Sequence, residues 1–248
     1  MKVGIIGTGA IGSTLVEKLS QAGHQVKVTN TRAMPELEKI AAGLGASAAT
    51  IHDVVKDVDA IIFSMPFNAY KDLPKDLLKE VLQDVVVMDT SNYYPFRDGE
   101  IAELEEITES EYISRILNRP LVKVFNNILE YTLKHHGKTA GAEGRVAISI
   151  AGDNPEHKKI VSQLVDITGF DTVDAGNLAE SWRQQPGTPA YCTELNKADL
   201  IIALSQADRE KAPAIRDLIM DGLRSKTSWP SYEEILAGNR ALQILKKY

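Results

Sequence analysis

The sequence contains a single cysteine, Cys192, among its 248 residues. One cysteine cannot form an intrachain disulfide, and such a chain fits a reducing cytosol. No stretch approaches the ~18–20 continuous apolar residues that a membrane-spanning helix requires. Because the chain begins directly with residues typical of a strand, we expect no signal peptide. The sequence therefore predicts a cytoplasmic protein without a membrane segment.

Blocks of positive charge are also missing, and the formal net charge is −6. A nucleic-acid surface or an anionic membrane surface is usually recognised by clustered Lys and Arg, so neither is expected as a partner. The sequence has no internal repeat and no low-complexity segment. Its length permits one large α/β domain, or one domain with a smaller appended part.

The stretch MKVGIIGTGAIG at the start of the chain combines an apolar run with three glycines at G-x-G-x-x-G spacing. Ile11, Leu15 and Leu19 then recur every four residues, which predicts a helix. Between a strand and a helix, such glycines allow a sharp turn, a close approach of a pyrophosphate, and tight helix–strand packing. The alternative is a glycine turn without a ligand. The expected cofactor contacts are Gly7, Thr8, Gly9, Ala10, Ile11 and Gly12.

The end of the second predicted strand, Gln25–Thr29, bears on the choice of dinucleotide. NAD-preferring folds usually place Asp or Glu there, whereas this chain has Asn30, Thr31 and Arg32. A threonine hydroxyl can donate to a 2′-phosphate and a guanidinium can pair with it, so we predict NADP(H) as the cofactor. The alternative is an arginine in a solvent-exposed loop.

Three later strands are predicted to end at the edge of the sheet where ligands bind. Ala60–Ser64 is followed by Met65, Pro66 and Phe67, of which Phe67 is expected either to line the cofactor site or to pack in the loop. The other two, Val85–Asp89 and Leu121–Phe125, are followed by Asn92 and Asn126. These five residues complete the predicted cofactor site.

Further elements follow from the periodicity and from turn signals. Two more strands are expected at Val146–Ile150 and Phe170–Asp174, and no convincing strand follows Gly176. We therefore divide the chain into a nucleotide-binding domain, 1–176, and a helical region, 177–248, with substrate and dimer contacts. The expected helices cover 35–44, 74–82, 99–117, 128–136, a segment capped by Asp153, 193–205, 208–223, a short segment from Ser231, and one ending at Tyr248. The fold class is α/β, a Rossmann doubly wound and mostly parallel sheet with a helical C-terminal extension.

Few polar residues outside this edge are candidates for catalysis. The acidic run from Asp98 is most simply a solvated helix face. His135 and His136 are adjacent, so they cannot both face one site on a helix, and we favour surface positions for them. Arg183 is expected to pair with an anionic acceptor or to form a salt bridge. No catalytic residue can be assigned and no metal cluster is expected.

Six segments in order carry a resemblance to a known family: GIIGTGAIGSTL, TNTR, DTSN, VKVFNNI, AGDNPEHKK and DAGNLAESW. Together they resemble the F420-dependent NADP oxidoreductase-like proteins over most of the chain. Relatives of this family include the ferric-reductase domain of STEAP proteins and, more distantly, pyrroline-5-carboxylate reductases. The resemblance implies NADPH binding by Gly7, Thr8, Gly9, Ile11, Thr31 and Arg32, with Asn126 beside the nicotinamide.

The resemblance also implies direct hydride transfer between NADP(H) and a deazaflavin- or flavin-like acceptor, with F420 or a flavin as second substrate. Such a reaction needs ring carbons held ~3–3.5 Å apart and no side-chain acid or base. One alternative is an imine or carbonyl reductase of the pyrroline-5-carboxylate reductase type. Another is a non-catalytic NADP(H)-sensing protein.

The segment from Tyr191 to Leu204 is apolar enough to bury two sides of a helix. A helix that is apolar on more than one face needs more than one covering neighbour. We therefore expect a homodimer whose C-terminal helices complete the pocket. The alternative is that the helix predicted over 208–223 covers this segment within one chain.

Overall fold

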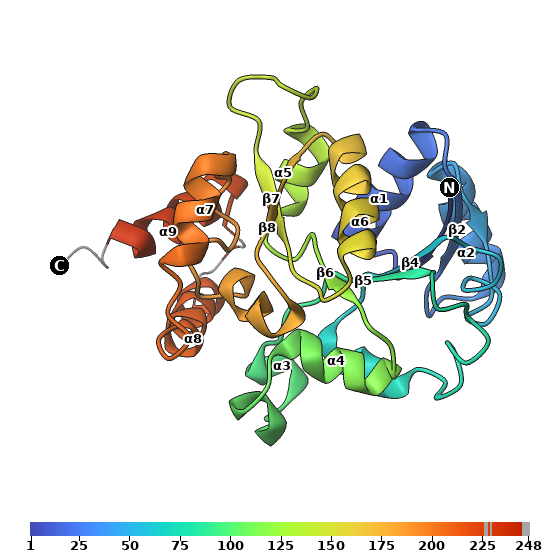
Figure 1. Ribbon diagram of the computed structural model, residues 1–248, viewed down its shortest axis with the longest axis horizontal. Helices are drawn as coiled ribbons and strands as arrows, with labels where there is room; N and C mark the ends of the chain where they lie inside the picture. Colours follow the sequence, from blue (N-terminus) through green and yellow to red (C-terminus); the bar gives the residue numbers. More distant parts are fainter. Residues whose placement is uncertain (226–227, 229, 245–248) are drawn as a thin grey trace.

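The computed structural model of the chain describes residues 1–225, 228 and 230–244. Its centre is a six-stranded parallel sheet with the order β3-β2-β1-β4-β5-β6 (Figure 1). This is the strand order of a Rossmann fold, in which the direction of winding reverses between β1 and β4. The predicted fold class is thus confirmed.

The strands of the two sheets are β1 (Lys2–Ile6), β2 (Gln25–Thr29), β3 (Ser47–Ala48), β4 (Ala60–Phe63), β5 (Val86–Asp89), β6 (Val122–Lys123), β7 (Ala147–Ile150) and β8 (Asp171–Asp174). The α-helices are α1 (Ala10–Gln21), α2 (Met34–Gly43), α3 (Pro95–Asp98), α4 (Glu109–Leu117), α5 (Glu130–His135), α6 (Pro155–Thr168), α7 (Lys197–Ser205), α8 (Ala212–Arg224) and α9 (Tyr232–Ile244). The described residues also form the short 3-10 helices η1 (Phe67–Asp72), η2 (Ala102–Glu105) and η3 (Leu178–Gln184).

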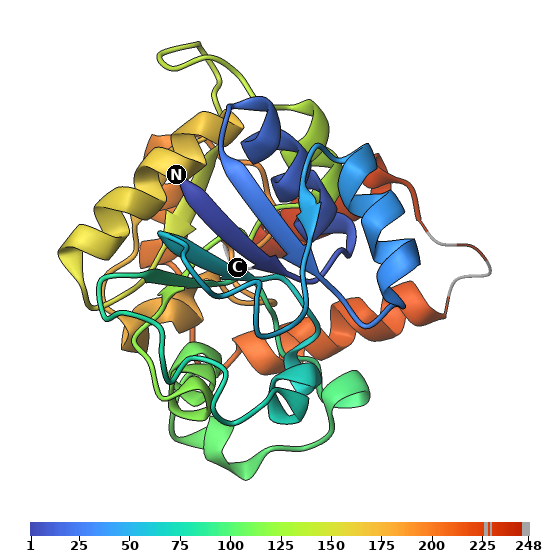
Figure 2. The same cartoon turned by 90° about the vertical axis from the view of Figure 1, so that its right-hand side faces the viewer.

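Alternate residues of the central strands point to opposite faces, and each face has its own core. Val3 and Ile5 of β1 pack with apolar residues of α1, α5 and α6. Ile61 and Phe63 of β4 pack against η1, α4 and the turns that precede β4. Figures 1 and 2 show these two layers on either side of the sheet. The strands therefore read as continuous apolar runs because both of their faces are covered.

The strands β7 and β8 form a separate parallel pair rather than continuing the main sheet. An antiparallel bridge between Lys123 and Ala151 connects β6 to the end of β7. One side of the pair packs into the core shared with α6, and the other side packs against Leu200, Ala203 and Leu204 of α7. The pair thus links the nucleotide-binding sheet to the C-terminal helices.

Several predicted helix boundaries are wrong. The segment 74–82 forms turns, from which Leu77 and Leu78 reach the core. The predicted helix from Gly99 starts only at Glu109, because the side chain of Thr108 caps that helix and Glu111 completes a capping box. The predicted cap of α6, Asp153, instead accepts a hydrogen bond from the backbone N–H of Leu178. The actual N-cap of α6 is the next residue, Asn154.

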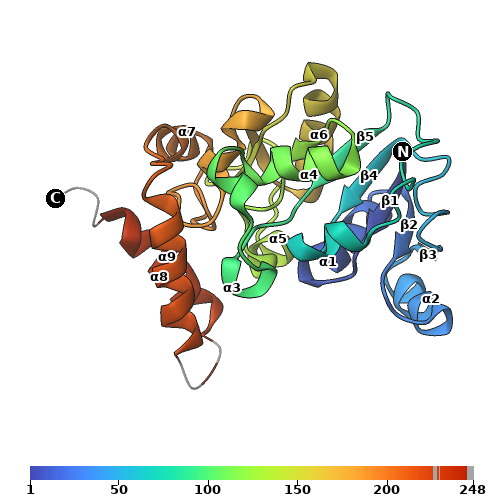
Figure 3. The ribbon, with the colours of Figure 1, turned by 90° about the horizontal axis from the view of Figure 1, so that it is seen from below.

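The C-terminal helices α7, α8 and α9 lie at the end of the molecule opposite β2 and β3 (Figure 3). The helix α7 begins only after Asn196, whose side chain caps it. A single helix, α9, replaces the two predicted after Ser231, and the predicted end at Tyr248 lies outside the described residues. Among the helices that the structure describes, none is both long and apolar enough to cross a membrane.

Candidate cofactor and acceptor site

The glycine loop between β1 and α1 has the geometry that its sequence predicts. Gly7 has φ +112°, and a Cβ there would lie 2.0 Å from the carbonyl oxygen of Ser64. A Cβ on Gly12 would lie 2.3 Å from the carbonyl oxygen of Gly7. At Gly9, in contrast, a Cβ would meet nothing within 4 Å. The first and third glycines are therefore needed by the fold, and the middle one faces open space.

The open side of this loop meets the N-terminus of α1. Gly9 is the N-cap and makes no side-chain capping bond, so the first backbone N–H groups of the helix are available to a ligand. Ala10, exposed, is the first helical residue, and Ile11 is half-buried. The Thr8 carbonyl oxygen accepts a hydrogen bond from the Ser13 hydroxyl, 3.0 Å away. Unpaired N–H groups at a helix N-terminus favour a phosphate.

The end of β2 lies against the glycine loop. Asn30 Nδ2 donates to Thr8 Oγ1 at 2.6 Å, while Asn30 Oδ1 accepts from the backbone N–H of Arg32 at 2.8 Å. Thr31 and Arg32 are exposed, and the Arg32 guanidinium pairs with the Glu36 carboxylate. The sequence interpretation missed this carboxylate because it stands four residues further along, in the first turn of α2. A 2′-phosphate must therefore compete with Glu36 for the guanidinium.

The loop after β4 differs in part from the prediction. Met65 is half-buried and Pro66 is exposed at this edge. The Phe67 side chain is only 2% exposed and packs on the rings of Tyr93 and Tyr112. The prediction that the Phe67 ring lines the cofactor site is therefore wrong, and the alternative, that this ring packs within the protein, is correct. The reason is that η1 starts at Phe67 and turns its ring into the core.

Asn92 and Asn126, predicted from two different strands, meet directly. Asn126 Nδ2 donates to Asn92 Oδ1 at 3.0 Å and to the carbonyl oxygen of Gln184 at 2.9 Å. Gln184 Nε2 in turn donates to Asn126 Oδ1 at 2.8 Å. Both amide hydrogens of Asn126 are thus donated to partners within the protein, and Asn126 is only 3% exposed. This places Asn126 as a link between the strand ends and η3.

Strained backbone lies at the same junction. Phe125, the second residue after β6, has φ +58° and Cys192 has φ +52°. The backbone N–H of Cys192 donates to the carbonyl oxygen of Asn127, 3.0 Å away. Non-glycine residues with positive φ persist only where their surroundings hold them, and they are often found at functional sites.

A buried ion pair joins the carboxyl ends of β5 and β6, and the sequence analysis did not predict it. Lys123 Nζ lies 2.7 Å from Asp89 Oδ2, and both side chains are at most 1% exposed. The Tyr70 hydroxyl donates to Asp89 Oδ1 at 2.6 Å. Burial and the adjacent Asp89 raise the pKa of Tyr70 well above its usual range. The available signal was a lysine inside the apolar run LVKVF.

Glu109, in the acidic stretch predicted to be solvated, is 5% exposed. Its Oε2 accepts a hydrogen bond from the backbone N–H of Tyr93, 3.1 Å away. Burial raises the pKa of Glu109 from 4.5 to about 7, against the opposing influence of Lys123, this hydrogen bond and Arg216. A carboxyl group with such a pKa exchanges its proton near neutral pH. Nothing in the residues around Glu109 distinguishes this glutamate from its acidic neighbours.

The other polar candidates have partners inside the protein. The Tyr232 hydroxyl lies 3.2 Å from His136 Nδ1. Arg183 forms a salt bridge with Glu180 and lies over the Trp182 ring, which favours the structural alternative for it. Tyr94 and Tyr191 share a hydrogen bond of 2.8 Å, and burial raises the pKa of both hydroxyls.

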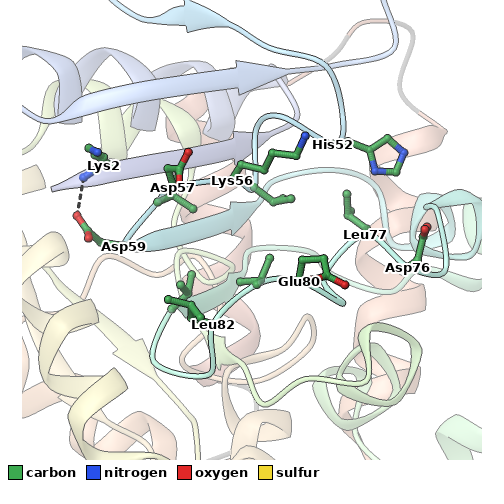
Figure 4. A pocket seen from close by; sticks show the side chains of 13 residues that line it. Lys2, His52, Lys56, Asp57, Asp59, Asp76, Leu77, Glu80 and Leu82 are labelled. Carbon is green, nitrogen blue, oxygen red and sulfur yellow. Dashed lines mark hydrogen bonds between the residues drawn. The ribbon is translucent and has the colours of Figure 1, made fainter.

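A cavity of about 590 Å³ lies at the opposite edge of the sheet (Figure 4). It is lined by residues at or before the amino ends of the strands, including Lys2, the first residue of β1, whose backbone N–H donates to Asp59 Oδ2 at 2.7 Å. Because dinucleotides bind at the carboxyl ends of the strands, this cavity is not the cofactor site. Within the residues that the structure describes, no group of His, Cys, Asp and Glu side chains is arranged to hold a metal ion.

The strand order and the glycine loop define a Rossmann-fold nucleotide-binding protein. Residues 2–93 match the family model described as NADP oxidoreductase, coenzyme F420-dependent. The YjhV protein of Escherichia coli is 35% identical over 108 residues, which is 44% of this chain and 79% of that protein. The chain belongs to this family of NAD(P)-dependent oxidoreductases.

Further comparisons cover a larger part of the chain. Metalloreductase STEAP3 of Rattus norvegicus is 26% identical over 207 residues, 82% of this chain but only 39% of STEAP3. The crystal structure of protein SMa0349 from Sinorhizobium meliloti has a TM-score of 0.66 and 26% identity, and the match covers 79% of this chain and 95% of that one. The match to an imine reductase from Aspergillus terreus covers 100% of this chain and 74% of that one, with a TM-score of 0.53 and 15% identity. At this identity the similarity concerns the fold alone.

Proposed function

We propose that this protein is an NADPH-dependent oxidoreductase that transfers a hydride between NADP(H) and a deazaflavin- or flavin-type acceptor, such as F420. The observation that carries the proposal is the open position at Gly9 beside the uncapped N-terminus of α1. The family match to an F420-dependent NADP oxidoreductase supports the choice of acceptor. Bound NADPH would supply a hydride at C4 of its nicotinamide ring, and the protein would hold the two rings in contact.

The residues around the glycine loop fit a bound dinucleotide. We assign the pyrophosphate to the backbone N–H groups after Gly9, since a side chain there would block the approach. We assign the 2′-phosphate to Thr31 and Arg32, which are exposed at the end of β2. The linked amides of Asn92 and Asn126 would fix the strand ends that carry the nicotinamide. Direct transfer between rings requires no side-chain acid at this place.

The first test is the cofactor preference. Loss of a charge-assisted contact to the phosphate is worth ~1.5–3 kcal/mol, so Arg32→Ala should weaken NADPH binding ~10-fold or more and leave NADH binding nearly unchanged. Glu36→Gln should instead strengthen NADPH binding, since it frees the guanidinium. Titration of both dinucleotides by calorimetry measures this, with Lys39→Ala on the same helix as a control. Equal affinity of the unaltered protein for NADH and NADPH would contradict the assignment.

We also propose that the active form is a homodimer. The helix α7 packs on β7 and β8 through Leu200, Ala203 and Leu204, while Ile201 and Ile202 are 51% and 52% exposed. Two adjacent exposed isoleucines on a helix that is already packed on its other side suggest a second covering surface. A partner chain that packs there would lie near η3 and would help to enclose the acceptor.

A further inference from the structure

A second cavity, of about 780 Å³, separates the nucleotide-binding domain from the C-terminal helices. One wall comes from η2 and α4, and the other from η3 and α8. Tyr93 and Pro95 also line it, and they follow Asn92 in the loop after β5. Gln185, the residue after Gln184, completes this connection to the amide network. The cavity thus adjoins the candidate acceptor site.

Glu109 lies in the lining of this cavity and is more than nine-tenths buried. One of its carboxyl oxygens, Oε2, is held by the Tyr93 backbone N–H. In the described part of the chain no hydrogen bond holds the other oxygen, Oε1, and this atom is not one of the fully buried side-chain atoms that lack a partner, so solvent reaches it. A ligand that donates to Oε1 would replace that solvent with a hydrogen bond to a charged group.

The charges around Glu109 leave the lining negative. Four carboxylates line the cavity, against two guanidinium groups. Arg216 already donates to Asp217 through Nε and Nη2, at 2.8 and 3.1 Å, and lies over the Tyr93 ring. Arg209 donates to the carbonyl oxygen of Glu106 at 3.2 Å. Both arginines are thus engaged by the protein, whereas the glutamates Glu100, Glu105 and Glu210 are exposed at the rim.

Two aromatic residues, Tyr93 and Trp182, also line the cavity. Arg216 lies over the Tyr93 ring and Arg183 over the Trp182 ring, so both rings already have a cation of the protein beside them. The attraction for an organic cation therefore comes from the carboxylates, and it is stronger in a partly desolvated place. We propose that this cavity binds an organic cation with a flat apolar body, a protonated cyclic amine or imine, with Glu109 as its counter-ion.

This inference deepens the proposed function. Binding of the cation stands apart from that function, and only the imine as hydride acceptor rests on it. A carboxylate beside an imine nitrogen favours the protonated form, which is the form that accepts a hydride at carbon. The hydride adds to that carbon, the C=N π electrons become the lone pair of nitrogen, and a neutral amine results. The cavity would then admit imines as acceptors, an activity separate from reduction of a flavin-type ring.

The test compares two probes of the same shape, 1,2,3,4-tetrahydroisoquinoline, which is a cation at neutral pH, and isochroman, its neutral oxygen analogue. Calorimetric titration at pH 8 should show tighter binding of the amine. Glu109→Gln should weaken binding of the amine ~10-fold or more, as expected for loss of a contact between charged groups. The same substitution should leave the affinity for isochroman unchanged. Glu105→Gln at the rim is the matched control and should change amine affinity less than ~3-fold.

The unaltered protein gives an independent reading, should Glu109→Gln fold poorly. The groups that act on Glu109 are Lys123 of β6, Asp89 of β5, Arg216 of α8 and the Tyr93 N–H. Because the cation prefers the ionised carboxylate, amine affinity should rise as pH increases from 6 to 8, while isochroman affinity stays constant. Equal affinity for the two probes, or an amine affinity that does not change with pH, would overturn the inference.

Two further measurements separate this inference from the proposed function. NADPH titrations on the same samples show whether the dinucleotide binds, independently of the amine. Amine binding without NADPH binding would refute the proposed function and support the cation site. NADPH binding without amine binding would refute the cation site alone. Oxidation of NADPH by 3,4-dihydroisoquinoline, with kcat/KM reduced in Glu109→Gln, supports the imine as acceptor, and no oxidation overturns that choice.

Discussion

Single residues account for most of what the sequence could predict about the cofactor site. Gly7 and Gly12 are required because backbone atoms occupy the place of their Cβ, and Gly9 is open as predicted. The interactions that were missed join residues far apart in sequence, such as the Tyr93 N–H and Glu109. Sequence spacing does not reveal such pairs, since burial of a particular glutamate depends on which elements close over it.

The buried pair of Lys123 and Asp89 gives a prediction about stability. Lys123→Met leaves the Asp89 charge buried without its partner, so the free energy of unfolding should fall by ~3–5 kcal/mol. Urea unfolding at pH 7 measures this change. The double variant Asp89→Asn with Lys123→Met removes both charges and should regain most of the loss. A single variant within ~0.5 kcal/mol of the unaltered protein would contradict this account.

Glu109 should make stability depend on pH even without a ligand. Its pKa is raised from 4.5 in the unfolded chain to about 7 in the folded protein. Its contribution to stability is therefore complete below pH 4.5 and is lost as pH rises through 7. The unaltered protein should lose up to about 3 kcal/mol relative to Glu109→Gln between pH 5 and pH 8. Parallel stability curves for the two proteins would show that Glu109 is not buried as described.

At the scale of elements, strands were predicted more accurately than helices. Strands buried on both faces appear as short apolar runs, and these were found with errors of a residue or two. The helix predicted over 74–82 fails because its leucines reach the core from turns instead. The helix from Gly99 fails because the Thr108 cap starts it ten residues later. Periodicity predicts apolar contacts, but a cap decides where a helix begins.

The Thr108 cap can be tested directly. Its side chain accepts from the Glu111 backbone N–H, and the Glu111 side chain accepts from the Thr108 N–H at 2.9 Å. Thr108→Ala should lower the free energy of unfolding by about 1 kcal/mol, whereas Thr108→Ser should retain most of the stability. Thermal unfolding of the three proteins in parallel measures both effects. Equal loss in the two variants would mean that methyl packing, not capping, matters at this position.

At the scale of the whole molecule, the boundary near residue 177 stays a prediction. The described structure has strands up to Asp174 and only helices after it. The β7–β8 pair is packed from both sides, so the helical region is tied to the nucleotide-binding sheet. The sequence could place this change of composition, but it could not show that a cavity with a buried carboxyl group lies between the two parts.

The proposed dimer predicts the behaviour of the molecule in solution. Sedimentation at micromolar concentration should show two chains per particle. Replacing Ile201 and Ile202 by Asp should give single chains, because two charges would face the partner. Ile167→Asp, at another exposed isoleucine on α6, is the control and should leave the dimer intact. A monomeric unaltered protein would remove the proposal.

The central claim is hydride transfer from NADPH, and isotope transfer tests it most directly. NADPH labelled with deuterium at C4, on one face and then on the other, is incubated with the protein and a 5-deazaflavin, whose C5–H bond does not exchange with water. Mass spectrometry of the reduced deazaflavin should show one deuterium with one of the two labels. With NADPH bound to the protein, absence of deuterium from both preparations would contradict the account.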